Sequence, residues 1–127
     1  MNSAKEVITE TIKDNEFFIH LGDFLDHFYR SKHNVRQNMI DESPLSFKTV
    51  VSPNYLAFVA ATVHKLANDY NLTVPEWVFD SAWYLSGDSP YFTGNVRGNL
   101  RLIFLYLSPT EFKHRNLFVD ENVLKRV

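Results

Sequence analysis

The sequence predicts an all-α fold, a compact single-domain bundle of five to seven helices spanning residues 1–127. Apolar residues recur at helical spacing along most of the chain. Serine followed by proline, a strong helix start, occurs at Ser52-Pro53 and Ser108-Pro109. Only residues 102–107 form a strand-like apolar run, and a lone strand would leave its backbone groups unpaired. A chain of 127 residues is long enough for one core and hardly for two.

Three helices are expected in the N-terminal part. Residues 4–13 (AKEVITETIK) form a short amphipathic pattern. Residues 16–31 are a longer helix with Asn15 as its N-cap, because apolar residues recur at i, i+4, i+7 and i+11, as Phe17, Leu21, Phe24 and Phe28. Phe18 is expected to join the wide buried stripe of this helix. Asn34 opens one short turn that continues through Ile40 and ends before Pro44.

The middle of the chain is expected to hold the central helix. Ser52 caps a helix over residues 53–70, and Asn71 closes it in the left-handed conformation. Pro75 begins a short helix to Leu85. Residues 86–95 are rich in glycine, proline, aspartate and asparagine and are expected to be a loop. Residues 96–107 fit a buried helix or a buried strand, and the helix is favoured because no second strand-like run is present.

The C-terminal part carries a capping box. In Ser108-Pro109-Thr110-Glu111 a capping serine, a first-position proline and a glutamate at the third position predict a short helix to about His114. Phe118 and Val119 are expected to dock, and Asp120 caps a final turn that carries Val123, Leu124 and Val127.

Composition excludes several classes of protein. The net charge of −2 and the isoelectric point of 6.2 argue against a protein whose affinity comes from neutralising phosphates. The absence of cysteine removes disulfide scaffolds, thiol catalysis and cysteine-based metal centres. No apolar run follows the polar N-terminus, so no signal peptide is expected. No stretch reaches the roughly 20 apolar residues that cross a bilayer, and we expect a cytoplasmic protein without a cofactor.

One pattern has the geometry of a metal site. His20, Asp23 and His27 lie at i, i+3 and i+7 of one predicted helix, so two imidazoles and a carboxylate share a stripe. These groups are good ligands for zinc or ferrous iron. The same stripe is also the polar back of an amphipathic helix, where such residues are expected for solvation alone. The second interpretation is favoured, and no metal is expected.

Aromatic residues crowd the segment from Trp77 to Phe92, partly in the predicted loop. Packing in the core is the ordinary role for such side chains, but aromatic and arginine side chains also anchor protein interfaces. If the segment forms a partner-binding surface, its expected residues are Trp83, Tyr91, Phe92, Arg97 and Arg115.

The C-terminal half resembles a known but poorly characterised bacterial domain. The residues that carry the resemblance are Val74-Pro75-Glu76-Trp77, Tyr84-Leu85, Pro90-Tyr91-Phe92, the run from Ser108-Pro109 through Phe112, Arg115-Asn116 and Phe118-Val119, and the ending Leu124-x-Arg126-Val127. In that family the domain occurs alone or C-terminal to a helix-turn-helix repressor domain, in toxin–antitoxin-like operons. The resemblance covers roughly residues 21–127, implies a partner encoded nearby, and brings no catalytic set. No helix-turn-helix precedes the domain in this sequence, which argues against direct DNA binding.

These observations favour a non-enzymatic, cytoplasmic protein-binding module, antitoxin-like or an operon partner. An enzyme is the first alternative and would need Asp80, His64, Arg101 and Arg115 to converge in one pocket. A weak nucleic-acid-binding accessory domain is the second. Residues 1–92 carry a net charge of −5 and residues 93–127 one of +3, so the basic C-terminal residues either form a patch or pair with the acidic part. Internal pairing or simple solvation is favoured.

Overall fold

The described part of the chain is all-α, as the periodicity predicts. The computed structural model describes residues 3–44, 52–80, 91–92, 108–115, 117–120 and 122–126. Five α-helices lie in these ranges: α1 (Ala4–Asp14), α2 (Phe17–Arg30), α3 (His33–Asp41), α4 (Pro53–Asp69) and α6 (Thr110–Lys113). The described residues also include a 3-10 helix, η2 (Glu76–Phe79), and two short paired strands, β1 (Tyr91–Phe92) and β2 (Leu117–Phe118).

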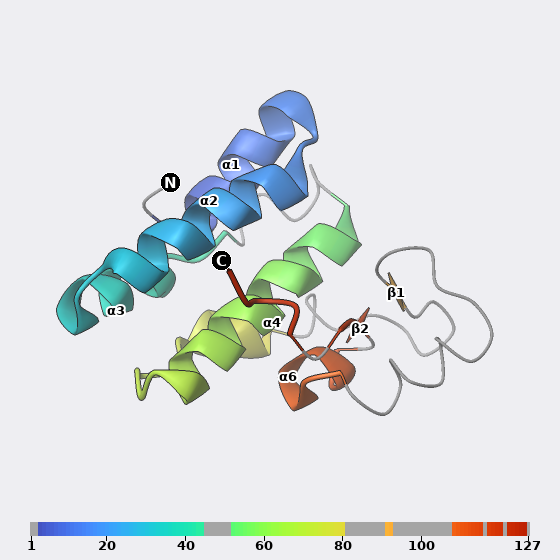
Figure 1. Cartoon of the computed structure of the whole chain (residues 1–127). Helices are drawn as coiled ribbons and strands as arrows, with labels where there is room; N and C mark the ends of the chain where they lie inside the picture. Colours follow the sequence, from blue (N-terminus) through green and yellow to red (C-terminus); the bar gives the residue numbers. More distant parts are fainter. Residues whose placement is uncertain are drawn as a thin grey trace.

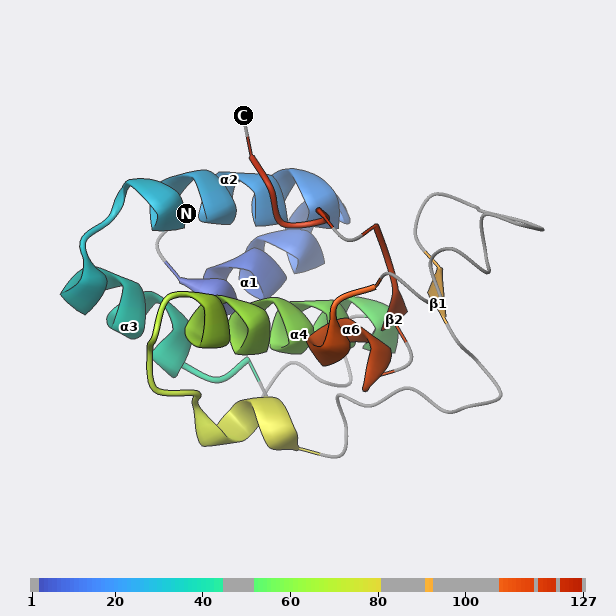
Figure 2. The same cartoon turned by 60° about the horizontal axis from the view of Figure 1, so that its bottom comes forward.

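The helix α4 lies at the centre of the described elements. Figure 2 shows α1 and α2 on one side of it and η2 on the other, with α6 alongside. Every residue from Leu56 to Val63 is buried, together with Leu66 and Ala67. A helix that is apolar all round must be covered on all sides, which is why α4 is central. Ser52 caps it through a bond to the Asn54 N–H, and Asn71 has a φ of 56°, as predicted.

The helices α1 and α2 form a hairpin whose turn corrects one expectation. Asn15 has a φ of 59° and donates its N–H to the Thr11 carbonyl at 2.7 Å, so it closes α1 instead of capping α2. Asparagine tolerates the left-handed conformation better than other side chains, which suits it to this end of a helix. Glu16 is the N-cap residue of α2, without a side-chain cap bond. Similarly, α3 begins at His33, one residue before the expected Asn34.

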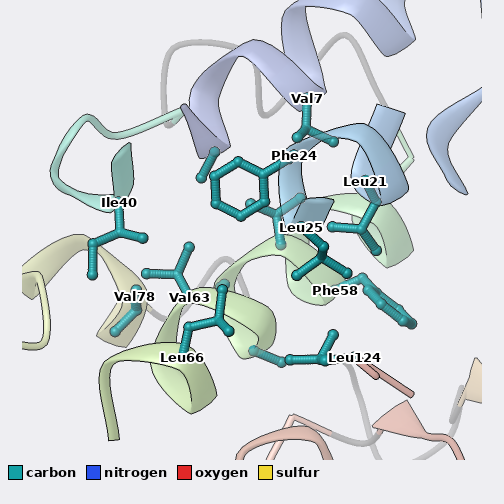
Figure 3. Close-up of a cluster of buried hydrophobic side chains, with 14 of the residues drawn as sticks. Val7, Leu21, Phe24, Leu25, Ile40, Phe58, Val63, Leu66, Val78 and Leu124 are labelled. Carbon is teal, nitrogen blue, oxygen red and sulfur yellow. The ribbon is translucent and has the colours of Figure 1, made fainter. Parts of the chain in front are cut away.

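The core draws one face from almost every described helix (Figure 3). Phe58 of α4 lies between aromatic rings of two other helices, 5.6 Å from Phe17 and 5.1 Å from Phe112 between centroids. The apolar side chains that meet around α4 include Val7 from α1, Phe24 from α2, Ile40 from α3, Val78 from η2 and Leu124 from the C-terminal segment. The expected docking of Val119 is confirmed, because Val119 is fully buried and belongs to this core.

The segment after α4 departs from the predicted helices. The helix expected from Pro75 to Leu85 is a single 3-10 turn that ends at Phe79, because Asp80 is already extended with a ψ of 135°. Within the loop expected over 86–95, residues 91–92 pair in parallel with Leu117 and Phe118. The remainder of 86–95, residues 81–85, and the helix expected over 96–107 lie outside the described residues.

Ser108 does not form the predicted capping box. Pro109 occupies the N-cap position of α6 and makes no side-chain cap bond. The Ser108 hydroxyl instead accepts from the Val119 N–H at 2.7 Å and donates to the Val119 carbonyl at 2.8 Å. Ser108 thus ties the start of α6 to Val119, the residue that follows β2. The short helix to about His114 is confirmed, as is the final turn, in which Asp120 accepts from the Asn122 N–H.

Candidate binding surface

Of the residues expected to form a partner-binding surface, the structure describes Arg115, Tyr91 and Phe92. Arg115 is 0% exposed, so it cannot meet a partner, and its assignment to such a surface is corrected. Tyr91 and Phe92 form β1. Trp83 and Arg97 lie outside the described residues.

Arg115 instead binds three elements together from inside. Its Nη1 donates to the Glu111 carbonyl at 2.8 Å, and its Nη2 donates to the Val78 carbonyl at 2.7 Å. Its Nη1 also lies 3.3 Å from Nδ1 of His64 on α4. A buried guanidinium must have its donors satisfied, and here backbone carbonyls of α6 and η2 satisfy two of them. The role of Arg115 in the described structure is to hold α6 and η2 against α4.

His64 faces a small pocket beside this arginine. The pocket has a volume of about 320 Å³ and is lined by His64, Asn68, Phe79, Thr110, Glu111 and His114. Burial, and then the charge of Arg115, lower the pKa of His64. Because a guanidinium only donates, Nδ1 of His64 must accept, which leaves its proton on Nε2 and the ring neutral. This geometry suits a structural acceptor.

Of the four groups that an enzyme would need, the structure describes His64, Asp80 and Arg115. His64 and Arg115 meet, and Asp80 follows η2 two residues beyond the Val78 carbonyl that Arg115 binds. Arg101 lies outside the described residues. Glu111, which was not among the expected groups, accepts a hydrogen bond from Asn68 at 2.9 Å. Burial opposes its ionisation, but the bonds from Asn68 and the backbone lower the pKa of Glu111 on balance.

In the histidine and aspartate stripe of α2, His20 is engaged with a carboxylate of α1. His20 Nε2 lies 2.9 Å from both carboxylate oxygens of Asp14, at the end of α1. The backbone N–H of Glu16 and the His20 ring together lower the pKa of Asp14. Over the ranges that the structure describes, no group of three or more His, Cys, Asp or Glu side chains is placed to hold a metal ion. His20 is thus used in closing the α1–α2 turn.

The end of the α1–α2 hairpin carries large apolar side chains that sequence reasoning missed. Ile12, Phe18 and Ile19 are 39%, 48% and 60% exposed, and all lie within four residues of the turn at Asn15. Phe18 packs one ring edge against Phe58, at 5.4 Å between centroids, but was expected to be fully buried. The signal was present as three consecutive apolar residues, 17–19, because one helix face cannot bury three neighbours in sequence. We call Ile12, Phe18 and Ile19 the apolar end.

Two further findings bear on what the chain is. In the described ranges, no helix combines the length and the apolar character needed to cross a membrane. Comparisons with family models, curated proteins and solved structures find no match for the chain.

Proposed function

We propose that the chain is a non-enzymatic, cytoplasmic protein-binding module, an antitoxin-like or operon-partner component of a bacterium. Its partner is another protein encoded nearby, and the apolar end of the α1–α2 hairpin is the surface that contacts it. The observation that carries the proposal is the exposure of Ile12, Phe18 and Ile19 together at one turn. Clustered exposed apolar side chains mark interaction sites, whereas single ones are ordinary.

The exposed area is large enough to matter for affinity. Burying a side chain of this size completely is worth about 1.5–3 kcal/mol, so covering the exposed half of each of the three contributes about 1 kcal/mol. The apolar end as a whole therefore contributes about 3 kcal/mol, or roughly a hundredfold in affinity. That is the contribution of a hot spot within a larger interface.

The class of partner is supported by the sequence resemblance to a bacterial domain of toxin–antitoxin-like operons. Binding is also supported by the contacts of the side chains that had suggested an enzyme or a metal site. Arg115 and His64 are engaged in holding α4, α6 and η2 together, and His20 is engaged with Asp14. Each of these has a structural use in the described residues, which favours binding over catalysis.

The test is co-expression of the chain with the product of each adjacent gene, followed by purification on a tag carried by the chain. Ile12→Ser with Ile19→Ser removes two exposed side chains but keeps the ring contacts of Phe18. We expect this double variant to bind the partner roughly thirtyfold more weakly, from about 2 kcal/mol of lost burial. Where the neighbouring product arrests growth, the double variant also fails to restore growth.

Val35→Ser is the matched control, because Val35 is 41% exposed but lies on α3. It should bind the partner as the original chain does. All three chains should give the circular dichroism spectrum of the folded protein. The urea midpoint of the double variant should be lower, because Ile12 and Ile19 are partly buried, so binding is compared where every chain is fully folded. A chain that stays monomeric with every adjacent gene product contradicts the proposal, and so does an equal loss of binding in the control and the double variant.

A further inference from the structure

The structure also has a basic pocket, whose charged lining differs from the apolar end. It has a volume of about 570 Å³ and lies where the end of α2 meets α3, the end of α4 and the C-terminal segment. Four of its lining residues are cations, Arg30, Arg36, Lys125 and Arg126, and one is a carboxylate, Asp26. The lining therefore carries a net charge of three positive units although the whole chain is slightly acidic. Two tyrosines complete it.

Arg36 is held in place as part of the wall. Its Nε donates to the Phe28 carbonyl at 2.9 Å and its Nη2 donates to the Tyr29 carbonyl at 3.0 Å, both at the C-terminal end of α2. Its guanidinium also lies over the ring of Tyr70, 4.7 Å from the centroid. A cation held by fixed acceptors and an aromatic face loses little freedom when a ligand binds. Arg36 is thus a preorganised positive charge.

The C-terminal segment supplies the opposite wall. The Tyr29 hydroxyl donates to the Leu124 carbonyl at 2.7 Å, and burial raises the pKa of Tyr29 to about 12, so this donor stays protonated. Arg126 forms a forked pair with Asp26, at 3.0 Å from Nε and 3.2 Å from Nη2. Figure 1 shows the C-terminal segment returning to α2. The pocket exists because residues nearly a hundred positions apart meet there.

Two of the four cations remain available to a ligand. Asp26 is already engaged with Arg126, whose hydrogen bond is the main cause of the lowered pKa of that carboxyl. Arg30 and Lys125 are exposed and form no ion pair within the described ranges of the chain. Arg30 and Lys125 line the same pocket, where the carboxylate of Asp26 is used by Arg126, so an anion that enters the pocket is favoured. Arginine and lysine side chains are both common ligands of phosphate groups.

We propose that this pocket binds a phosphorylated small molecule that carries at least two phosphate groups. A single carboxylate would leave most of the excess positive charge uncompensated, whereas a pyrophosphate group balances it. The volume lies in the range of small-molecule sites, about 300–1,000 Å³. Tyr29 and Tyr70 also line the pocket, and their apolar rings and polar hydroxyls are available to the remainder of the ligand. The site is independent of the apolar end and goes beyond the proposed protein binding.

The experiment is calorimetric titration of the full chain with pyrophosphate at low and high salt, with NMR to locate the site. We expect binding of one pyrophosphate that weakens as salt rises, with shifted signals at Arg30, Arg36, Tyr70 and Lys125. Arg30→Gln with Lys125→Gln should weaken binding at least tenfold. Ile12→Ser with Ile19→Ser should bind pyrophosphate unchanged, which separates this proposal from the preceding one.

Lys5→Gln with Lys13→Gln is the matched control, because it also removes two cations but from α1. It should keep pyrophosphate binding within twofold. Equal weakening in the two double variants overturns the proposal, since only net charge would then matter. Binding of citrate as tightly as pyrophosphate overturns the phosphate class, and tighter binding of a mixed-sequence DNA duplex overturns the small-molecule class. Absence of pyrophosphate binding overturns the site itself.

Discussion

Replacing Ser108 by alanine should cost much more than loss of a helix cap. The hydroxyl satisfies both the N–H and the carbonyl of Val119, at 2.7 Å and 2.8 Å. Val119 is fully buried and Ser108 is 4% exposed, so water does not readily replace the hydroxyl. Leaving a buried polar group unsatisfied costs about 1–3 kcal/mol, and two groups are affected. We therefore expect Ser108→Ala to lower the free energy of unfolding by about 3 kcal/mol.

Urea unfolding followed by circular dichroism measures this loss. A capping serine would account for only about 1 kcal/mol, so the two roles of Ser108 are separated by the size of the effect. Ser31→Ala is the control, because the Ser31 hydroxyl donates to a single carbonyl, that of His27, in a partly buried position at the end of α2. If Ser108→Ala costs no more than Ser31→Ala, the double hydrogen bond to Val119 does not hold the C-terminal segment in place.

Three further changes test the local structure by the same unfolding measurement. Asn15→Ala should cost about 1 kcal/mol and Asn15→Gly should not, because the φ of 59° strains a Cβ; equal losses would contradict the left-handed closure of α1. Gly22→Ala should stabilise α2 by about 0.5–1 kcal/mol, because glycine loses more backbone freedom than alanine in a helix, provided that the guanidinium of Arg126, 3.0 Å from the added Cβ, shifts; a loss of stability would mean that its pair with Asp26 holds it in place. Stability should fall as pH drops below 6.5, because the lowered pKa of His64 lets the unfolded chain bind the proton first. His64→Gln should make stability depend less on pH in this range, and an unchanged dependence would mean that another titrating group causes it.

Periodicity predicted the helices that make most of the core. The apolar residues of α2 and α4 recur at helical spacing, and both helices are long enough for the pattern to be unambiguous. Ser52 and Pro53 also mark the start of α4 correctly, since the Ser52 hydroxyl accepts from the Asn54 N–H and Pro53 takes the first helical position. Short elements are different. Four residues in η2 carry too little periodicity to separate a single turn from a longer helix.

The errors at helix ends have a common physical reason. Asparagine and serine can each satisfy backbone groups in several ways, and local sequence does not say which neighbours are present. Asn15 was expected to accept from the first turn of α2, but it closes α1. Ser108 stands before a proline and three residues before Glu111, yet its hydroxyl is used by Val119, eleven residues away. A tertiary partner that satisfies two buried groups outweighs a cap that satisfies one.

The net charge of each part of the sequence did not predict where the charged side chains lie in the fold. The net charge of +3 in residues 93–127 was expected to form a basic patch or to pair with the acidic part. Arg126 does pair with Asp26, yet it also lines the basic pocket, while Arg115 points inward to backbone carbonyls. The other pocket cations include Arg30 and Arg36, which belong to the net acidic part of the chain. A sum over a segment hides such residues because acidic neighbours in the sequence cancel their charge in the total. The fold, by returning the C-terminal segment to the end of α2, gathers cations from both parts, and this explains how a chain of net charge −2 can present a concentrated site for a polyanion.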